Sequence, residues 1–107
     1  EGSAVSINYI SGSTKKIGTM SLARRALRTE SKVIIIDDFM KAGGTAKGMI
    51  DLMKEFKAEV LGMGVFVDTQ EPEQKLVGNY LGLLELVELD EKKEIVKIVS
   101  KSFAFEV

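Results

Sequence analysis

Apolar and polar side chains alternate strictly near the start of the chain, from Val5 to Tyr9. This period of two is typical of a strand with one buried face. The small and polar residues of segment 11–18 interrupt the pattern, and residues 19–27 resume an ordered one. We interpret residues 19–27 as a strand that returns from the loop and then turns, although residues 20–27 alone would also fit two helical turns.

The middle of the chain carries two apolar runs separated by a helical pattern. Residues 33–36 (Val-Ile-Ile-Ile) and 60–67 are rich in aliphatic side chains, which is typical of parallel strands that are covered on both faces. Between these runs, apolar residues recur at helical spacing with charged residues in the other positions. The apolar positions are Ala46, Met49, Ile50, Met53 and Phe56. This order predicts a strand, a helix and a second strand in an α/β domain.

The last third of the chain predicts one helix and two strands. Pro72 suits the first position of a helix. The apolar face of this helix would contain Leu76, Val77, Tyr80 and Leu81. Residues 83–89 and 94–99 predict two strands joined by a polar turn. No repeat, low-complexity tract or linker divides the sequence, so we expect one α/β unit.

Composition places the chain among soluble globular proteins and excludes several kinds of chemistry. Its 107 residues are 45% hydrophobic and 29% charged, with a formal net charge of −1. The absence of cysteine and histidine excludes disulfides, thiol nucleophiles and soft-metal sites, which leaves hard cations such as Mg²⁺ bound through oxygen. DNA-binding modules usually carry a basic excess, so we do not expect this chain alone to hold DNA. No apolar run approaches the roughly 20 residues of a membrane span, and we expect a cytoplasmic protein without a membrane partner.

Candidate chemistry lies where the 33–36 strand meets the following helix. Asp37 and Asp38 follow the strand directly, at the sheet edge where α/β proteins bind ligands. Gly43 and Gly44 allow the backbone to curl with a positive φ, and the helix that follows adds its positive N-terminal end. This arrangement predicts a phosphate monoester in the glycine turn. The two carboxylates suit neighbouring sugar hydroxyls, directly or through a divalent cation.

Segment 33–45, Val-Ile-Ile-Ile-Asp-Asp-Phe-Met-Lys-Ala-Gly-Gly-Thr, resembles the phosphoribosyl pyrophosphate (PRPP) motif of type I phosphoribosyltransferases. The resemblance implies that the acidic pair binds the ribose 2′ and 3′ hydroxyls and that the loop binds the 5′-phosphate. It implies a PRPP site, with or without Mg²⁺ on the ligand and with no metal site of the protein's own. The implied PRPP-binding residues are Asp37, Asp38, Phe39, Met40, Lys41, Ala42, Gly43, Gly44 and Thr45.

Segments 6–13 and 19–27, together with the PRPP motif, are most similar to the purine operon repressors of Gram-positive bacteria. The resemblance implies an α/β fold of the type I phosphoribosyltransferase kind, with a mostly parallel sheet flanked by helices. Residues 1–107 would be the C-terminal portion of a PRPP-binding effector domain that regulates and does not catalyse. A winged-helix domain outside this chain would bind operator DNA, and PRPP, or a competing phosphorylated nucleotide, would modulate that binding. The family commonly forms homodimers through this domain.

The loop 11–18 is a candidate lid for this site. In the phosphoribosyltransferase family a hairpin loop from this region closes over the pyrophosphate of PRPP, and two lysines would supply charge to it. The candidate lid residues are Tyr9, Ser11, Lys15 and Lys16. The alternative is an ordinary hairpin loop whose lysines contact only water.

Lys41 favours a sensor over an enzyme. Several purine-salvage phosphoribosyltransferases carry an aspartate at this position, able to act on the base nitrogen, whereas an exposed lysine stays a cation suited to phosphate. An active type I phosphoribosyltransferase of purine salvage remains an alternative. A phosphoacceptor receiver domain is another, because it opens with a similar strand ending in two aspartates, and here a later strand ends at Asp68. The glycine turn and the order of the strands count against the receiver.

Overall fold

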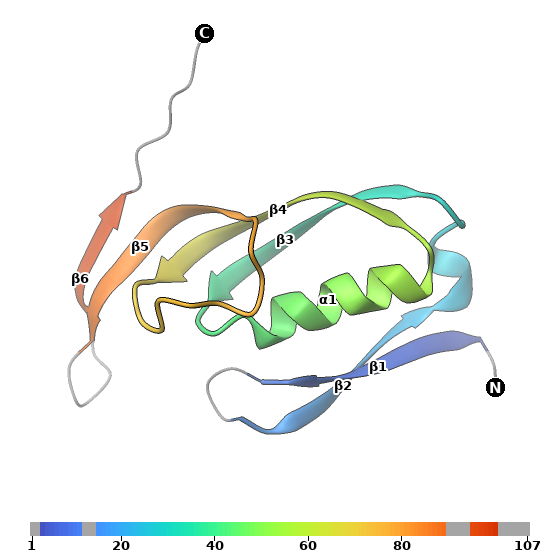
Figure 1. Ribbon diagram of the computed structural model, residues 1–107, viewed down its shortest axis with the longest axis horizontal. Helices are drawn as coiled ribbons and strands as arrows, with labels where there is room; N and C mark the ends of the chain where they lie inside the picture. The colour runs from blue at the N-terminus through green and yellow to red at the C-terminus, as the bar shows by residue number, and fades with distance from the viewer. Residues whose placement is uncertain (1–2, 12–14, 90–94, 101–107) are drawn as a thin grey trace, which may run out of the picture.

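The computed structural model describes residues 3–11, 15–89 and 95–100 (Figure 1). Its elements in chain order are β1 (Ala4–Ile10), β2 (Ile17–Ala23), the short 3-10 helix η1 (Arg24–Ala26), β3 (Lys32–Met40), α1 (Gly44–Glu55), β4 (Glu59–Thr69), β5 (Leu81–Leu89) and β6 (Ile95–Ser100). The predicted strands and the helix after the glycine turn are confirmed. Residues 19–27 form a strand and a turn, as we interpreted them. The polar turn expected between the last two strands lies outside the described residues.

The four-stranded sheet is mostly parallel. Its strand order is β3-β4-β5-β6, in which β3 pairs with β4 and β4 with β5 in parallel, whereas β5 and β6 are antiparallel. Parallel neighbours need a crossover connection, and α1 is the crossover between β3 and β4. Because β3 and β4 run in the same direction, their carboxyl ends lie together at one edge of the sheet, beside the start of α1 (Figure 1).

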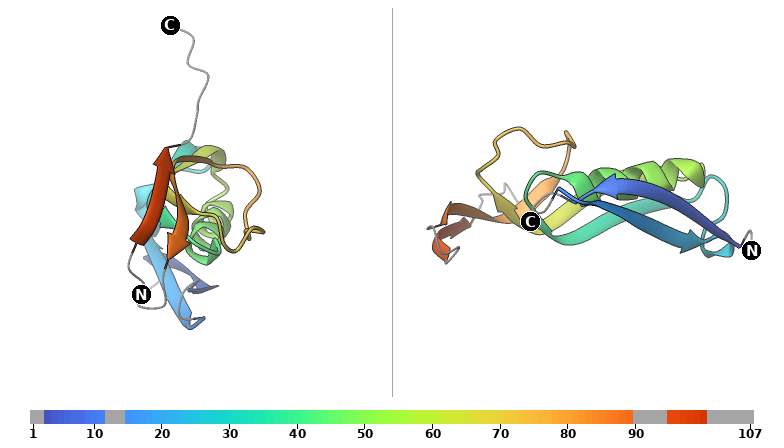
Figure 2. Two further views of the ribbon diagram at one scale, coloured as in Figure 1. Left: turned by 90° about the vertical axis from the view of Figure 1, so that its left-hand side faces the viewer. Right: turned by 90° about the horizontal axis from the view of Figure 1, so that it is seen from below.

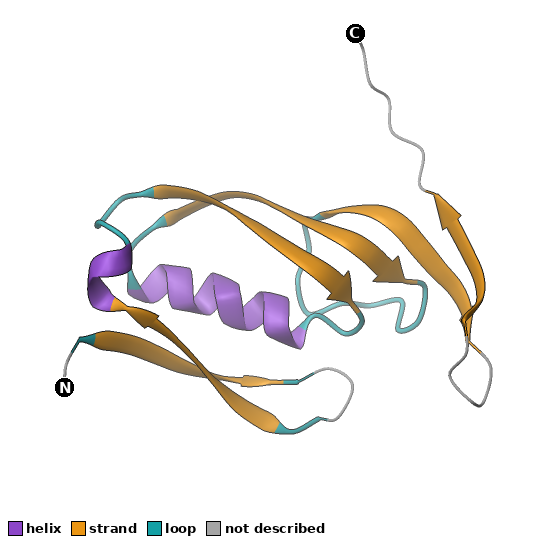
Figure 3. Ribbon diagram, turned by 180° about the vertical axis from the view of Figure 1, so that it is seen from behind, coloured by secondary structure: helices purple, strands orange, loops and turns teal. Residues whose placement is uncertain are grey.

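Helix α1 lies between the sheet and the hairpin formed by β1 and β2 (Figure 3). One side of α1 packs on the sheet around a buried core of Ile35, Met40, Ala46, Met63, Val65 and Val77. The other side carries the hairpin, whose two antiparallel strands alternate between half-buried and exposed residues. In the described part of the chain, no helix has the length and apolar character that crossing a membrane requires.

A glycine in α1 sets how closely the hairpin approaches. Gly48 is buried, and a Cβ atom added there would lie 2.8 Å from Cβ of Tyr9. Tyr9 also covers Gly18 of β2, where an added Cβ would lie 2.9 Å from its ring. Tyr9 therefore packs against Gly48 of α1 and Gly18 of β2, and this contact holds the hairpin close to α1.

Gly48→Val is expected to lower the free energy of unfolding by about 1 to 3 kcal/mol, the usual cost of overpacking. The new side chain would push the hairpin away from α1, and this cost exceeds the small gain in helix propensity over glycine. Urea denaturation of the full-length protein measures the change. Gly62→Val in β4 is the control, because an added Cβ there meets nothing within 4 Å. An equal loss in both variants would contradict the role given to Tyr9.

The outer face of the sheet is open among the described residues, so the prediction that residues 33–36 are covered on both faces is wrong for this part of the chain. Ile35 is 7% exposed, but Ile34 and Ile36 are 65% and 63% exposed. Ile36 lines a shallow apolar depression on this face together with residues of β4 and β5. A run of branched aliphatic residues marks both faces as apolar, but α1 packs against only one of them.

Residues 70–80 do not form the predicted helix. They make an irregular crossover that leaves the sheet after β4 and returns past the start of α1 to begin β5 (Figure 2). Of the predicted apolar face, Val77 is buried, whereas Leu76 is 56% exposed and Leu81 already belongs to β5. The backbone N–H of Leu76 donates to the carbonyl of Ala42 at 2.9 Å. Local spacing predicts a helix here, but contacts with a distant loop determine the conformation.

Candidate functional site

The glycine loop between β3 and α1 has a backbone that suits an anion. Gly43 is the N-cap residue of α1 and has a φ of +96°, a left-handed conformation that glycine adopts at little cost. Gly44 is instead the first residue of α1, so the positive φ expected at both glycines occurs at Gly43 and not at Gly44. No side chain caps this end of α1 in the described structure. Its first N–H groups are therefore available to a ligand.

A cavity of about 140 Å³ opens at this loop. The lining includes every predicted PRPP-site residue except Asp38. It consists of Asp37, Phe39, Met40, Lys41, Ala42, Gly43, Gly44 and Thr45, with Ser11 and Ala46 in addition. The structure thus gathers residues from the end of β3, the start of α1 and the segment after β1 around one hollow.

The two acidic residues take different positions. Asp37 lines the cavity and is half-buried, whereas Asp38 is exposed and outside the lining. Both lie within β3, and successive side chains of a strand point to opposite faces. Asp37 Oδ1 accepts the backbone N–H of Asp38 at 2.8 Å. Burial raises the pKa of Asp37, while this hydrogen bond opposes the rise. Of the two carboxylates, Asp37 is the one that lines the cavity.

Of the four candidate lid residues, only Ser11 lines the cavity. Tyr9 packs on α1, and Lys15 and Lys16 are exposed at the base of the loop. Two backbone hydrogen bonds close this base. The Lys15 N–H donates to the Ser11 carbonyl at 2.9 Å, and the Ser11 N–H donates to the Lys16 carbonyl at 2.8 Å. Residues 12–14 lie outside the described part of the chain, and the lid function of the two lysines stays a prediction.

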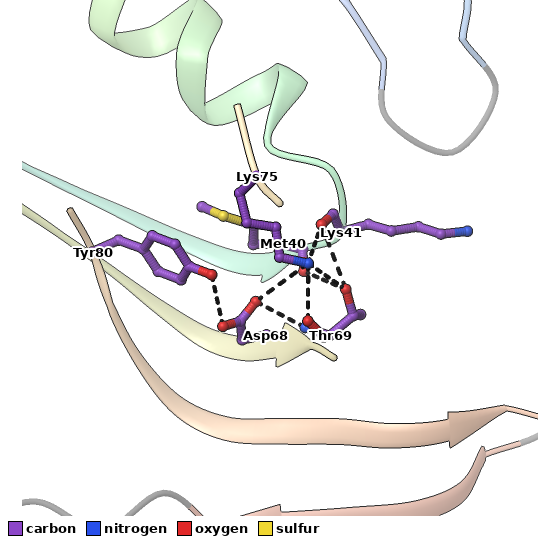
Figure 4. Close-up of polar contacts among 6 residues, drawn as sticks. All are labelled: Met40, Lys41, Asp68, Thr69, Lys75 and Tyr80. Atoms are coloured by element: carbon purple, nitrogen blue, oxygen red, sulfur yellow. Dashed lines mark hydrogen bonds and ion pairs between the residues drawn. The ribbon is translucent and has the colours of Figure 1, made fainter. Parts of the chain in front are cut away.

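A buried polar cluster behind the loop was not anticipated from the sequence (Figure 4). Lys75 Nζ donates to the carbonyl of Lys41, and to the carbonyl and Oγ1 of Thr69, both at 2.9 Å. It also lies 3.8 Å from Oδ1 of Asp68, and these two side chains are 6% and 4% exposed. Tyr80 donates its hydroxyl to Asp68 Oδ2 at 2.8 Å. Burial, together with the Asp68 carboxylate, raises the pKa of Tyr80.

One signal in the sequence points to part of this cluster. Asp68 comes near the end of the strand that pairs with β3, so it lies at the same edge of the sheet as Asp37. Like Asp37, it accepts the backbone N–H of the following residue, Thr69, at 2.9 Å. No comparable signal marks Lys75 and Tyr80, because the irregular crossover between β4 and β5 carries them.

Comparison with known proteins agrees with this geometry. The family model for the phosphoribosyl transferase domain matches residues 3–100. The chain belongs to this family. The solved structure of adenine phosphoribosyltransferase from Thermoanaerobacter pseudethanolicus resembles this phosphoribosyl transferase domain with a TM-score of 0.66. The match covers 79% of this chain and 50% of that one at 18% identity, and it shows the fold alone. The expected type I phosphoribosyltransferase fold is thereby confirmed.

Two curated relatives are named as regulators. The phosphoribosyl transferase domain described here is 52% identical over 103 residues to the purine biosynthesis transcriptional repressor PurR of Bacillus subtilis. It is 42% identical over 99 residues to the probable purine biosynthesis transcriptional regulator PurR of Streptococcus pneumoniae. The alignments cover 96% and 92% of this chain but 36% of each relative. The chain therefore spans about a third of the length of these proteins.

Proposed function

We propose that this phosphoribosyl transferase domain is the effector-sensing part of a transcriptional repressor of purine biosynthesis genes, and that PRPP is its effector. The observation that carries the proposal is the 52% identity, over 96% of the chain, with a protein named as a purine biosynthesis transcriptional repressor. The cavity supports the choice of ligand, because its lining combines a glycine turn whose geometry suits an anion with a carboxylate.

In the proposed complex, the 5′-phosphate of PRPP lies in the turn at Gly43 and Gly44. The N–H groups of the turn and the positive end of α1 favour an anion there. Asp37 accepts hydrogen bonds from the ribose hydroxyls, and Lys41 adds a cation to the lining. Among the described residues, no three acidic side chains gather into a metal site. We propose that Mg²⁺, where present, is bound mainly by the pyrophosphate oxygens of PRPP, because Mg²⁺ binds readily to phosphates.

The domain is proposed to sense and not to catalyse. General acid–base catalysis on a purine needs a side chain that can exchange a proton with a base nitrogen. Among the described residues that line the cavity, Asp37 is the one carboxylate, and we assign it to the ribose. Lys41 is the one other ionisable side chain among these described residues, and a lysine suits a phosphate. The part of the lining that the structure describes thus favours binding of phosphate and ribose over proton transfer to a purine.

Regulation requires that PRPP and DNA binding be coupled. Because this chain spans about a third of its relatives' length, we assign DNA binding to a winged-helix domain elsewhere in the polypeptide. We also expect a homodimer. PRPP weakens repression if it prefers the conformation that holds DNA poorly, and DNA then weakens PRPP binding by the same factor. A competing phosphorylated nucleotide in the same cavity would oppose PRPP.

Titration of the full-length protein with PRPP and Mg²⁺ is expected to show saturable binding by calorimetry. The same additions are expected to weaken its complex with promoter DNA from a purine biosynthesis gene. No nucleoside monophosphate should form from PRPP and adenine, guanine, hypoxanthine or xanthine. Formation of a nucleotide would favour the enzyme, and a DNA affinity that does not respond to bound PRPP would overturn the sensor.

A further inference from the structure

The polar cluster behind the glycine loop holds that loop by its carbonyl oxygens. Three consecutive carbonyls are engaged by the end of β4 and by the crossover that follows it. Thr69 Oγ1 donates to Met40 O at 3.3 Å, Lys75 Nζ donates to Lys41 O, and the Leu76 N–H donates to Ala42 O at 2.9 Å. A segment distant in sequence therefore determines how the peptide planes of the loop are oriented.

The orientation of these peptide planes affects the ligand site. In a trans peptide, the carbonyl of one residue and the N–H of the next point in opposite directions. Carbonyls of Lys41 and Ala42 that point to the crossover direct the N–H groups of Ala42 and Gly43 away from it. Ala42 and Gly43 line the cavity, whereas Lys75 does not. Lys75 thus affects the orientation of the N–H donors of Ala42 and Gly43 without lining the cavity itself.

Lys75 is the central member of this cluster. An ammonium group has three donors, and the oxygen atoms of Lys41 and Thr69 accept from it here. Because the side chain is 6% exposed, solvent is poorly placed to replace these hydrogen bonds. The loop and the crossover are also in close backbone contact, since a Cβ atom added to Gly43 would lie 3.1 Å from the backbone nitrogen of Leu76.

We propose that Lys75 is a positioning residue for the effector site: its buried ammonium holds the Lys41 carbonyl and keeps the glycine loop in the conformation that receives a phosphate. Asp68 connects Lys75 to Tyr80, the residue that directly precedes β5, because it lies 3.8 Å from the Lys75 ammonium and accepts a hydrogen bond from the Tyr80 hydroxyl. The identity of the ligand rests on the proposed function, whereas the effect on the loop conformation does not.

The test separates this role from a contribution to stability alone. Lys75→Met keeps the side-chain length and removes the donors, but by itself it also removes the positive charge that lies 3.8 Å from the buried carboxylate of Asp68, which is expected to lower stability. The double variant Lys75→Met/Asp68→Asn removes both charges and is expected to recover thermal stability without restoring the hydrogen bond to Lys41. Lys47→Met is the matched control, because it removes a lysine that is 53% exposed on α1.

In the full-length double variant, the PRPP affinity is expected to fall by about tenfold or more, because apparent affinity scales with the fraction of loops in the binding conformation. Amide hydrogen exchange without ligand is expected to become faster at residues 41–44. Lys47→Met should change neither quantity. Thr69→Val, which deletes the hydroxyl that contacts Met40 and Lys75 without altering a charge, should show both effects at smaller size.

Unchanged PRPP affinity in a double variant of full stability would overturn the proposal, and so would unchanged exchange at residues 41–44. If the double variant fails to fold, Thr69→Val decides by the same two measurements. A wild-type protein that does not bind PRPP would overturn the proposed function instead, and hydrogen exchange would still decide the role of Lys75.

Discussion

Gly43→Val is expected to abolish measurable PRPP binding. A β-branched residue is strained at the φ of +96° that Gly43 adopts, at a cost of about 1 to 3 kcal/mol. Its Cβ would also lie 3.1 Å from the backbone nitrogen of Leu76, a tight contact that requires the loop or the crossover to shift. Both changes move the N–H donors away from the position that a phosphate needs. Calorimetry with PRPP and thermal denaturation of the full-length protein measure the two effects.

Gly62→Val provides the control for this experiment. Gly62 lies in β4, away from the loop, and an added Cβ there meets nothing within 4 Å. This variant should bind PRPP as the wild type does. Normal binding by Gly43→Val would show that the turn does not hold the phosphate, and loss of binding in both variants would indicate a general sensitivity of the fold.

Asp37→Asn is expected to weaken PRPP binding by about 1.5 to 3 kcal/mol, the usual worth of a hydrogen bond to a charged group. This corresponds to a dissociation constant roughly ten to a hundred times higher. The asparagine carbonyl oxygen can still accept the Asp38 N–H that Asp37 Oδ1 accepts at 2.8 Å, so the strand should keep its stability. Calorimetry at a fixed Mg²⁺ concentration measures the affinity, and the melting temperature monitors the fold.

Asp38→Asn is the matched comparison, because the same change of charge occurs one residue away. Asp38 is exposed and lies outside the cavity lining, so its loss should cost less than about 1 kcal/mol of binding, as for other exposed charges. A larger loss at Asp38 than at Asp37 would place the ribose on the other face of β3.

The elements nearest the site could be predicted from the sequence because their signals are local. Alternation identifies β1, aliphatic runs identify β3 and β4, and helical spacing identifies α1. The crossover 70–80 could not be predicted in this way. Its proline and its apolar spacing favour a helix, but the burial of Val77 in the core and the bond from Leu76 to Ala42 determine its path. Such contacts form only when the sheet and the glycine loop are in place, and they produce no periodic pattern in the sequence.

Most of the cavity lining lies in the one continuous segment, residues 37–45, that the sequence marks as the candidate PRPP site. Asp38 is outside the lining because β3 continues to Met40, so that the two adjacent acidic side chains point to opposite faces of the strand. The predicted role of the pair in binding ribose stays a prediction. The contribution of Lys75 could not be predicted, because its hydrogen bond to Lys41 joins residues 34 positions apart. The glycine loop and the crossover 70–80 come into contact only in the folded protein, so this interaction has no local signal in the sequence.

The open outer face of the sheet affects the protein concentration at which binding can be measured. In the described sheet β3 is an edge strand, and the apolar side chains of Ile34 and Ile36 lie exposed along it. An unpaired strand edge beside apolar surface promotes association between molecules. Light scattering from a solution of this domain would then grow with protein concentration, and a ligand titration would report on aggregates as well as on binding in the cavity. Binding curves of variants are therefore best compared at protein concentrations at which light scattering does not change.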